Sequence, residues 1–304
     1  MGAVLRSVDD LTDDEIRHVL VRAAAHERGA ADRHPAMPAG RGPVVGLLFL
    51  ETSLRTRVGF TAATARLGGT AVGVVVQRAS EISMPESVHD TLRTLMGYTD
   101  VVVARPGVPL LGDVIPDDSA TPVLSGGDRG PAMEHPSQAF IDLYAAEREL
   151  GGLAGVVVGI CGDPRMRSVA SLLRLMRRPA FRPRALRLIT TPGLLEGFAI
   201  PADLARITTI GGFDDAQDVD LLYVAGIPHG AASEPERTVM RVTPESLAML
   251  PAPAVVTSPL PVIDEISREA FADPRVRAFA HSDAGLFVRM ALLEHVLNRA
   301  LDHR

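Results

Sequence analysis

Residues 44–57 read VVGLLFLETSLRTR, an apolar run whose last five positions hold two hydroxyl side chains and two arginines. The run predicts a buried strand over Val44–Leu50, and the polar residues after it predict a turn and the start of a helix. Free N–H groups at a helix N-terminus, together with hydroxyls and arginine forks, can bind a phosphate-like dianion. A helix start with two solvated arginines is the alternative, and this stretch alone leaves both open.

The composition is that of a globular protein, with 46% hydrophobic residues among 304 and a formal net charge of −6. This length suits two domains of ordinary size. An acidic chain argues against a nucleic-acid partner, although arginines can still cluster locally. No apolar run reaches the length of a membrane span and the N-terminus lacks a secretory signal. We therefore expect a cytoplasmic protein with no membrane partner.

The single cysteine, Cys161, lies inside the apolar run 155–161. This position predicts a small buried side chain and not a nucleophile, and a disulfide within the chain is impossible. No cluster of Cys and His with metal-ligand spacing is visible. The sequence thus offers no Cys/His metal site.

Strand-like and helix-like segments alternate along the chain, which predicts an α/β fold with mostly parallel sheets. Helices are expected over residues 9–26, after His135, and over 286–301. Strands are expected at Val44–Leu50, Thr70–Val76, Val101–Ala104, Pro122–Ser125, Gly155–Cys161, Leu186–Thr190, Ile207–Ile210, Leu221–Val224, Ala254–Thr257 and Val276–Ala280. The two series of strands predict two α/β domains, each a doubly wound parallel sheet.

Polar residues and proline-bounded loops follow several of these strands. Arg105 follows one strand, His135 and Gln138 come after the loop that leaves another, and the segments 162–168 and 258–261 follow two more. Ligands of parallel sheets lie outside the carboxyl ends of the strands. Each residue alone has a structural explanation, such as a surface ion pair or a helix cap, but their shared position predicts one cleft.

Several short motifs keep one order from about residue 44 to the end of the chain: Phe49–Arg57, His135–Gln138, Gly162–Asp163, Asp218–Tyr223, Pro259–Pro261 with Asp264–Glu265, and Ala284–Arg289. Through these motifs the chain resembles the aspartate/ornithine carbamoyltransferase family, and its aspartate branch more than its ornithine branch.

The resemblance implies a carbamoyl-phosphate-binding domain over residues 1–137, an acceptor domain over 138–285, and a C-terminal helix over 286–304 that packs back on the first domain. It implies a homotrimer whose active sites are shared between subunits. It also implies transfer of a carbamoyl group from carbamoyl phosphate to an amine-bearing small molecule without a cofactor. This agrees with the chemistry, because a tetrahedral oxyanion needs positioned donors and both substrates need orientation.

The resemblance also carries over site residues by position. Ser53, Arg55 and Thr56 match residues that hold the phosphate. Thr56 also matches, with Arg105 and His135, the groups around the carbamoyl oxygen.

Five further positions complete the site that the resemblance implies. Gln138 and the carbonyls near Pro259 and Leu260 match acceptors for the carbamoyl NH₂ group. Ser80 falls where a mobile loop reaches into a neighbouring subunit's site. Arg167 matches an arginine that binds the carboxylate of the acceptor.

The chain departs from the family pattern at the phosphate loop. Leu54 replaces a threonine, so its backbone N–H remains while one hydroxyl is lost. Met84 stands where aspartate enzymes carry a lysine on the mobile loop. A charge-assisted hydrogen bond contributes about 1.5–3 kcal/mol, so carbamoyl phosphate should bind more weakly unless Arg78 or Arg129 compensates.

The acceptor side departs further. Gly226 and Pro228 stand where the aspartate branch has an arginine and a glutamine, Val262 replaces an arginine, and Ser258 replaces a histidine. Ser258 also lies where the ornithine branch has its characteristic cysteine. Because an unpaired buried carboxylate costs several kcal/mol, we expect an altered acceptor site and an acceptor that is neither aspartate nor ornithine.

Two alternatives to this enzyme remain open at the level of the sequence. One is a non-catalytic trimeric scaffold, which the changes at Leu54, Met84 and Gly226 would suit. The other is a family member that performs a different condensation or cyclisation. We favour the enzyme, because a decayed site would seldom keep six convergent polar groups.

Overall fold

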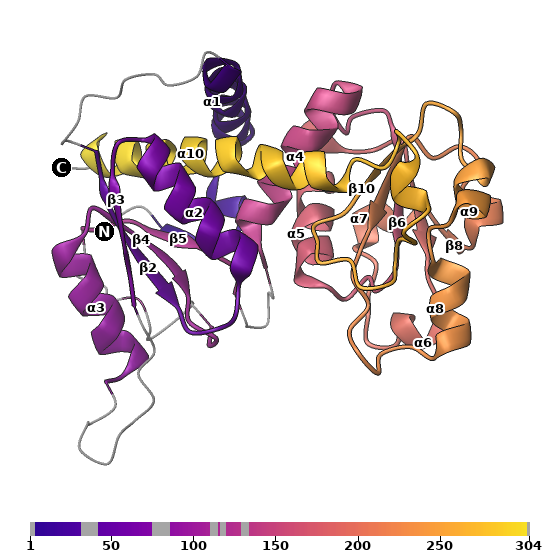
Figure 1. The fold of residues 1–304 in the computed structure, drawn as a ribbon, viewed down its shortest axis with the longest axis horizontal. Coiled ribbons are helices and arrows are strands. Elements are labelled where there is room, and N and C mark those ends of the chain that lie inside the picture. The colour runs from indigo at the N-terminus through magenta and orange to yellow at the C-terminus, as the bar shows by residue number, and fades with distance from the viewer. Residues whose placement is uncertain are drawn as a thin grey trace. The chain divides into compact units, whose positions relative to one another are not determined.

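The computed structural model describes residues 4–31, 42–74, 86–109, 115, 120–128 and 134–302. The chain divides into two compact units (Figure 1), one made of Met1–Phe140 with Gly285–Arg304 and the other of Ile141–Ala284. Two helices, α4 (Pro136–Leu150) and α10 (Ala278–Asp302), continue from one unit into the other along the chain.

The first unit is built on a parallel sheet in the order β1-β5-β4-β2-β3. Its remaining helices are α1, α2 and α3, and α2 packs on β2 and β3 while α3 packs on β2 and β4. The bounds of these elements are β1 (Val4–Leu5), η1 (Val8–Asp10), α1 (Asp13–Ala31), β2 (Val44–Phe49), α2 (Leu54–Arg66), β3 (Thr70–Gly73), α3 (Val88–Tyr98), β4 (Val101–Arg105) and β5 (Val123–Ser125).

The register of this sheet sets three strand ends side by side. Phe49 of β2 pairs with Arg105 of β4, and Ala104 of β4 pairs with Ser125 of β5. All three strands are parallel, so the loops that leave them emerge at one edge. The strands are apolar and buried because helices cover parallel sheets on both faces.

The second unit holds another parallel sheet, in the order β10-β9-β6-β7-β8. The amphipathic helix α5 buries its apolar side, including Val169 and Leu172, in this unit. The bounds are β6 (Val157–Cys161), α5 (Arg167–Met176), η2 (Pro179–Phe181), β7 (Ala185–Ile189), α6 (Pro192–Leu195), α7 (Ala202–Ala205), β8 (Thr208–Gly211), η3 (Phe213–Asp215), β9 (Leu221–Val224), α8 (Glu234–Met240), α9 (Pro244–Met249), β10 (Val255–Thr257) and η4 (Ala270–Ala272).

The two five-stranded parallel sheets confirm the predicted α/β fold class. The second half of α10 packs on the first unit, where Arg22 of α1 pairs with Glu294 through two hydrogen bonds. One expected strand, Val276–Ala280, is wrong. Val276 forms a single bridge to Val256, and α10 begins two residues later, so helix formation ends the pairing. The two-residue strand β1 was too short for its pattern to predict.

Candidate active site

The N-terminus of α2 lines a cleft of about 640 Å³ at the carboxyl end of β2. Ser53 precedes the helix, and its side chain makes no capping hydrogen bond. The first turn of a helix has N–H groups without intrahelical partners, and α2 has no acidic residue there. The cleft is therefore suited to an anionic ligand.

Two arginines place positive charge at this helix, Arg55 on α2 itself and Arg289 on α10. Arg55 is half-buried, and burial lowers its pKa. Arg289 of α10 is buried, with its guanidinium carbon 5.7 Å from the centre of the Phe60 ring. Burial, and then the charge of Arg55, lower the pKa of Arg289 to about 10. A bound dianion would relieve the repulsion between these two cations.

Arg105 and His135 approach each other around Gly127. A Cβ atom at Gly127 would lie 3.1 Å from both Nη1 of Arg105 and Cδ2 of His135, and the backbone there has a φ of +112°. Glycine adopts this conformation without steric penalty. Gly127 therefore allows both side chains to meet at the edge of the sheet.

Short contacts orient both of these side chains. Arg105 donates from Nε to a carboxylate oxygen of Glu51 at 3.1 Å, and both side chains are largely buried. The Nε2 atom of His135 lies 3.5 Å from Oγ1 of Thr56, and its Nδ1 lies 3.3 Å from Oγ of Ser137. The structure thus brings Thr56, Arg105 and His135 together beside the anion cleft.

Gln138 lies in the first turn of α4, where its backbone N–H donates to the carbonyl of His135 at 2.9 Å. Its side chain is half-buried. Leu54 is 73% exposed and lines the cleft at the start of α2. Ser80, Met84, Arg78 and Arg129 lie outside the described residues.

In the second unit, the loop after β6 leads to Arg167 at the first position of α5. Two residues earlier, Arg165 is held by Asp163 through a pair of hydrogen bonds of 2.9 Å each, which raise the pKa of Arg165. Asp163 itself is buried. Arg165 therefore stabilises the loop, and Arg167 is the arginine that this loop carries into the helix start.

The proline loop after β10 includes Pro259 and Leu260. Leu260 has a φ of +55°, which is uncommon for any residue other than glycine, and its N–H donates to Oγ of Ser258 at 3.2 Å. Such strained positions cluster at functional sites. Because β10 pairs with β9 and β9 with β6, this loop, residues 225–229 and the start of α5 emerge at one edge of the sheet.

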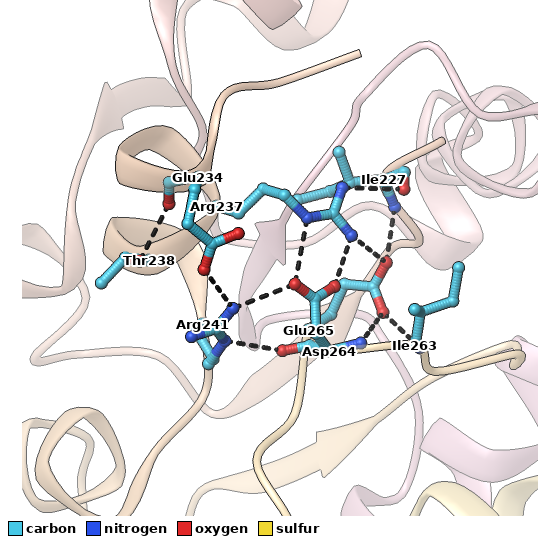
Figure 2. Close-up of polar contacts among 8 residues, drawn as sticks. All are labelled: Ile227, Glu234, Arg237, Thr238, Arg241, Ile263, Asp264 and Glu265. Carbon is cyan, nitrogen blue, oxygen red and sulfur yellow. Dashed lines mark hydrogen bonds and ion pairs between the residues drawn. The ribbon is translucent and has the colours of Figure 1, made fainter. Parts of the chain in front are cut away.

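Figure 2 shows a polar network that holds the backbone of Ile227 and that the sequence patterns did not predict. Glu265 accepts from the backbone N–H of Ile227 at 2.8 Å, and Arg237 donates to the Ile227 carbonyl at 3.1 Å. Arg237 also pairs with Asp264, which Arg241 contacts at 3.0 Å. Hydrogen bonds from Arg237 and then Arg241 lower the pKa of Asp264 to about 2.

Gly226 lies beside this network with space for a side chain. A Cβ atom there would come no closer than 3.9 Å to the carbonyl of Pro261. The neighbouring Pro228 is exposed. The adjacent acidic residues Asp264 and Glu265 were a signal for the network in the sequence. The arginine that pairs with them lies more than twenty residues away along the chain, so the sequence did not indicate the contact.

Cys161 has the structural position that the sequence predicted. It is buried, burial raises the pKa of its thiol, and its Sγ donates to the carbonyl of Met240. Within the described residues, no group of His, Cys, Asp and Glu has a metal-binding arrangement. None of the described helices is both long enough and apolar enough to cross a bilayer.

The family model described as aspartate/ornithine carbamoyltransferase, carbamoyl-P binding domain, matches residues 4–148. The aspartate carbamoyltransferase catalytic subunit of Archaeoglobus fulgidus is 32% identical to this chain, covering 96% of it and 98% of the relative. The chain belongs to the aspartate/ornithine carbamoyltransferase family. It is therefore a carbamoyl-transferring enzyme, as predicted.

Two solved structures extend this likeness. Aspartate transcarbamoylase of Trypanosoma cruzi in complex with carbamoyl phosphate superimposes with a TM-score of 0.83 at 29% identity, over 96% of this chain and 95% of that one. The same enzyme in complex with aspartate and phosphate also superimposes with a TM-score of 0.83 at 29% identity, over 96% and 94%. Several of the similar proteins are thus aspartate carbamoyltransferases.

The expectation of an acceptor other than aspartate or ornithine is wrong. Relatives about 30% identical over nearly the whole chain are named aspartate carbamoyltransferase catalytic subunits, which points to aspartate. The two alternatives, a non-catalytic scaffold and a different condensation or cyclisation, are wrong for the same reason. The expectation gave too much weight to Gly226 and Pro228, because losing two side chains of one loop changes individual contacts without determining the acceptor.

Proposed function

We propose that this enzyme transfers the carbamoyl group of carbamoyl phosphate to the amine of aspartate. The observation that carries the proposal is the convergence of Thr56, Arg105 and His135 beside the uncapped N-terminus of α2. Relatives that are similar over nearly the full chain are named for the aspartate reaction, and a structural neighbour was solved with aspartate and phosphate.

The chemistry fits these residues. The phosphate of the donor binds at Ser53, Arg55 and the free N–H groups of α2, which include that of Leu54. The aspartate amine attacks the carbonyl carbon, and a tetrahedral oxyanion forms. Thr56 and Arg105 donate to this oxyanion, with His135 beside them. The C–O bond to phosphate then breaks, and the phosphate leaves with the bonding electrons and takes up the proton that the amine loses.

The other predicted residues bind and orient the two substrates. Gln138 and the carbonyls of Pro259 and Leu260 accept hydrogen bonds from the carbamoyl NH₂ group. Arg167 pairs with a carboxylate of aspartate. Fixing both substrates in this way removes much of the entropic part of the barrier.

We further propose that the contacts to the second carboxylate of aspartate are altered in this enzyme. Gly226 has no side chain and Pro228 has no donor, so neither can bind a carboxylate through a side chain. The network around Arg237 supports this view, because it holds the backbone of Ile227, which lies between Gly226 and Pro228, without those two side chains. A higher KM for aspartate than in enzymes with the arginine–glutamine pair should follow.

A homotrimer with shared sites is also part of the proposal, with Ser80 of one subunit reaching its neighbour. Support comes from an apolar surface next to the cleft, where Leu54, Val58 and Val72 are 73%, 56% and 44% exposed. Leu54 and Val58 lie one turn apart on α2, which packs on the strand that carries Val72. Exposed apolar clusters of this kind mark protein interfaces. Cytoplasmic location remains a prediction.

The test is a screen of acceptors with the purified enzyme. Phosphate release is followed with carbamoyl phosphate and, in turn, aspartate, ornithine and other amines. Aspartate should give the highest kcat/KM, with carbamoyl aspartate as the product. Rapid turnover of another amine with none of aspartate would overturn the acceptor, and no turnover with any amine would overturn the proposed reaction.

A further inference from the structure

A buried histidine–carboxylate pair joins α4 to α10. The Nε2 atom of His281 lies 2.8 Å from Oδ1 of Asp142, and the two side chains are only 1% and 3% exposed. The pair lies within the second unit, and the proposed reaction does not use it. A buried pair of this kind is costly to desolvate, so its position calls for an explanation.

The position of Asp142 on α4 provides that explanation. Asp142 lies four residues after Gln138 on the same helix. Residues four apart lie on one face of a helix, one turn above the other. A contact that fixes Asp142 therefore also fixes the rotation of α4 about its axis, and with it the direction of Gln138.

We propose that His281 and Asp142 are positioning residues, which set the orientation of Gln138 toward the carbamoyl group. Neither residue touches a substrate. His281 holds Asp142 from α10, and Asp142 in turn fixes α4. This inference rests on the proposed function, because the affected step is carbamoyl transfer.

The test compares His281→Ala, Asp142→Asn and the double variant with the wild-type enzyme. Because small misplacements of oriented groups can lower rates about 100-fold, each single variant should lower kcat/KM by roughly 10- to 100-fold. The double variant should lose no more kcat/KM than the less active of the two single variants, because both substitutions remove the same contact. His281→Gln keeps a donor near Asp142 and should restore most of the activity.

His26→Ala is the matched control. His26 of α1 lies 2.9 Å from Glu294 of α10, so it also joins a helix to α10. Helix α1 carries none of the proposed site residues. It should change the melting temperature while leaving kcat and KM unchanged. The assays are run well below the melting temperature of every variant, so that each is folded.

Three outcomes separate the possibilities. Loss of kcat/KM in the single variants with rescue by His281→Gln supports the inference. Variants that lose thermal stability but keep wild-type kcat and KM, as the His26→Ala control does, would overturn it and leave a structural pair. Absence of turnover in the wild-type enzyme itself would overturn the proposed function, which is a different result.

Discussion

Replacement of Gly127 by alanine tests the convergence of Arg105 and His135 most sharply. The new Cβ atom would lie 3.1 Å from Nη1 of Arg105 and from Cδ2 of His135, which is closer than ordinary contact. One or both side chains must therefore move by a few tenths of an ångström. The backbone φ of +112° adds a conformational penalty of about 1–2 kcal/mol for a residue with a Cβ atom.

The two effects are separable by a matched variant. Gly151 also has a positive φ, of +76°, but a Cβ atom there would meet nothing within 4 Å. Gly151→Ala should thus show the backbone penalty alone, which is about 2–8 °C in melting temperature for a chain of this size. Gly127→Ala should show a similar or larger loss of stability and, in addition, the displacement of the two site residues.

Steady-state kinetics and thermal unfolding of both variants give the comparison. Gly127→Ala should lower kcat by roughly 100-fold, because a misplaced oxyanion donor costs about 2.7–4 kcal/mol of transition-state stabilisation. Gly151→Ala should keep the wild-type kcat. A Gly127→Ala enzyme with wild-type kcat and KM would refute the reasoning that Arg105 and His135 act together at this point.

Other predictions concern single side chains. Arg55→Ala should abolish the heat of carbamoyl phosphate binding in calorimetry, and retention of wild-type affinity would place the phosphate elsewhere. Val58→Asp should convert the proposed trimer to smaller species in light scattering, whereas an unchanged mass would exclude this surface from the interface. Because the folded-state pKa of Asp264 is depressed to about 2, its stabilising contribution is present above pH 4 and is lost as the pH falls toward 2. Asp264→Asn should be less stable than wild type at neutral pH and should lose less stability over that acid range, as unfolding titrations would show. Cys161→Ser should lower the melting temperature without changing kcat, and a large fall in kcat would give the thiol a role in the reaction.

The fold was predictable where sequence patterns act locally. The run 44–50 is apolar because β2 is covered on both faces, and its polar continuation begins where α2 begins. The expected strand at Val276 was misleading because Val276 forms only a single bridge, and the helix that begins at Ala278 ends the pairing. Strand β1 has only two residues, and no periodicity can be read from two residues.

The candidate site was predictable only in part, because its contacts join distant segments. Arg105 ends β4 and His135 comes after the loop that leaves β5, yet nothing local indicates that Gly127 lets them meet. The partners of Asp264 lie on α8 and just after it, and a salt bridge between separated elements has no sequence signature. The acceptor was misjudged for a related reason: two substitutions in one loop were weighed without the contacts that hold that loop.

The most direct test of the central claim is to follow ¹³C-labelled carbamoyl phosphate with aspartate by NMR, using the wild-type enzyme and Arg105→Ala. The account predicts that the label moves to carbamoyl aspartate in a one-to-one ratio with released phosphate, and that Arg105→Ala slows this transfer by a hundred-fold or more. Phosphate release without carbamoyl aspartate, or transfer at an unchanged rate in Arg105→Ala, would contradict it.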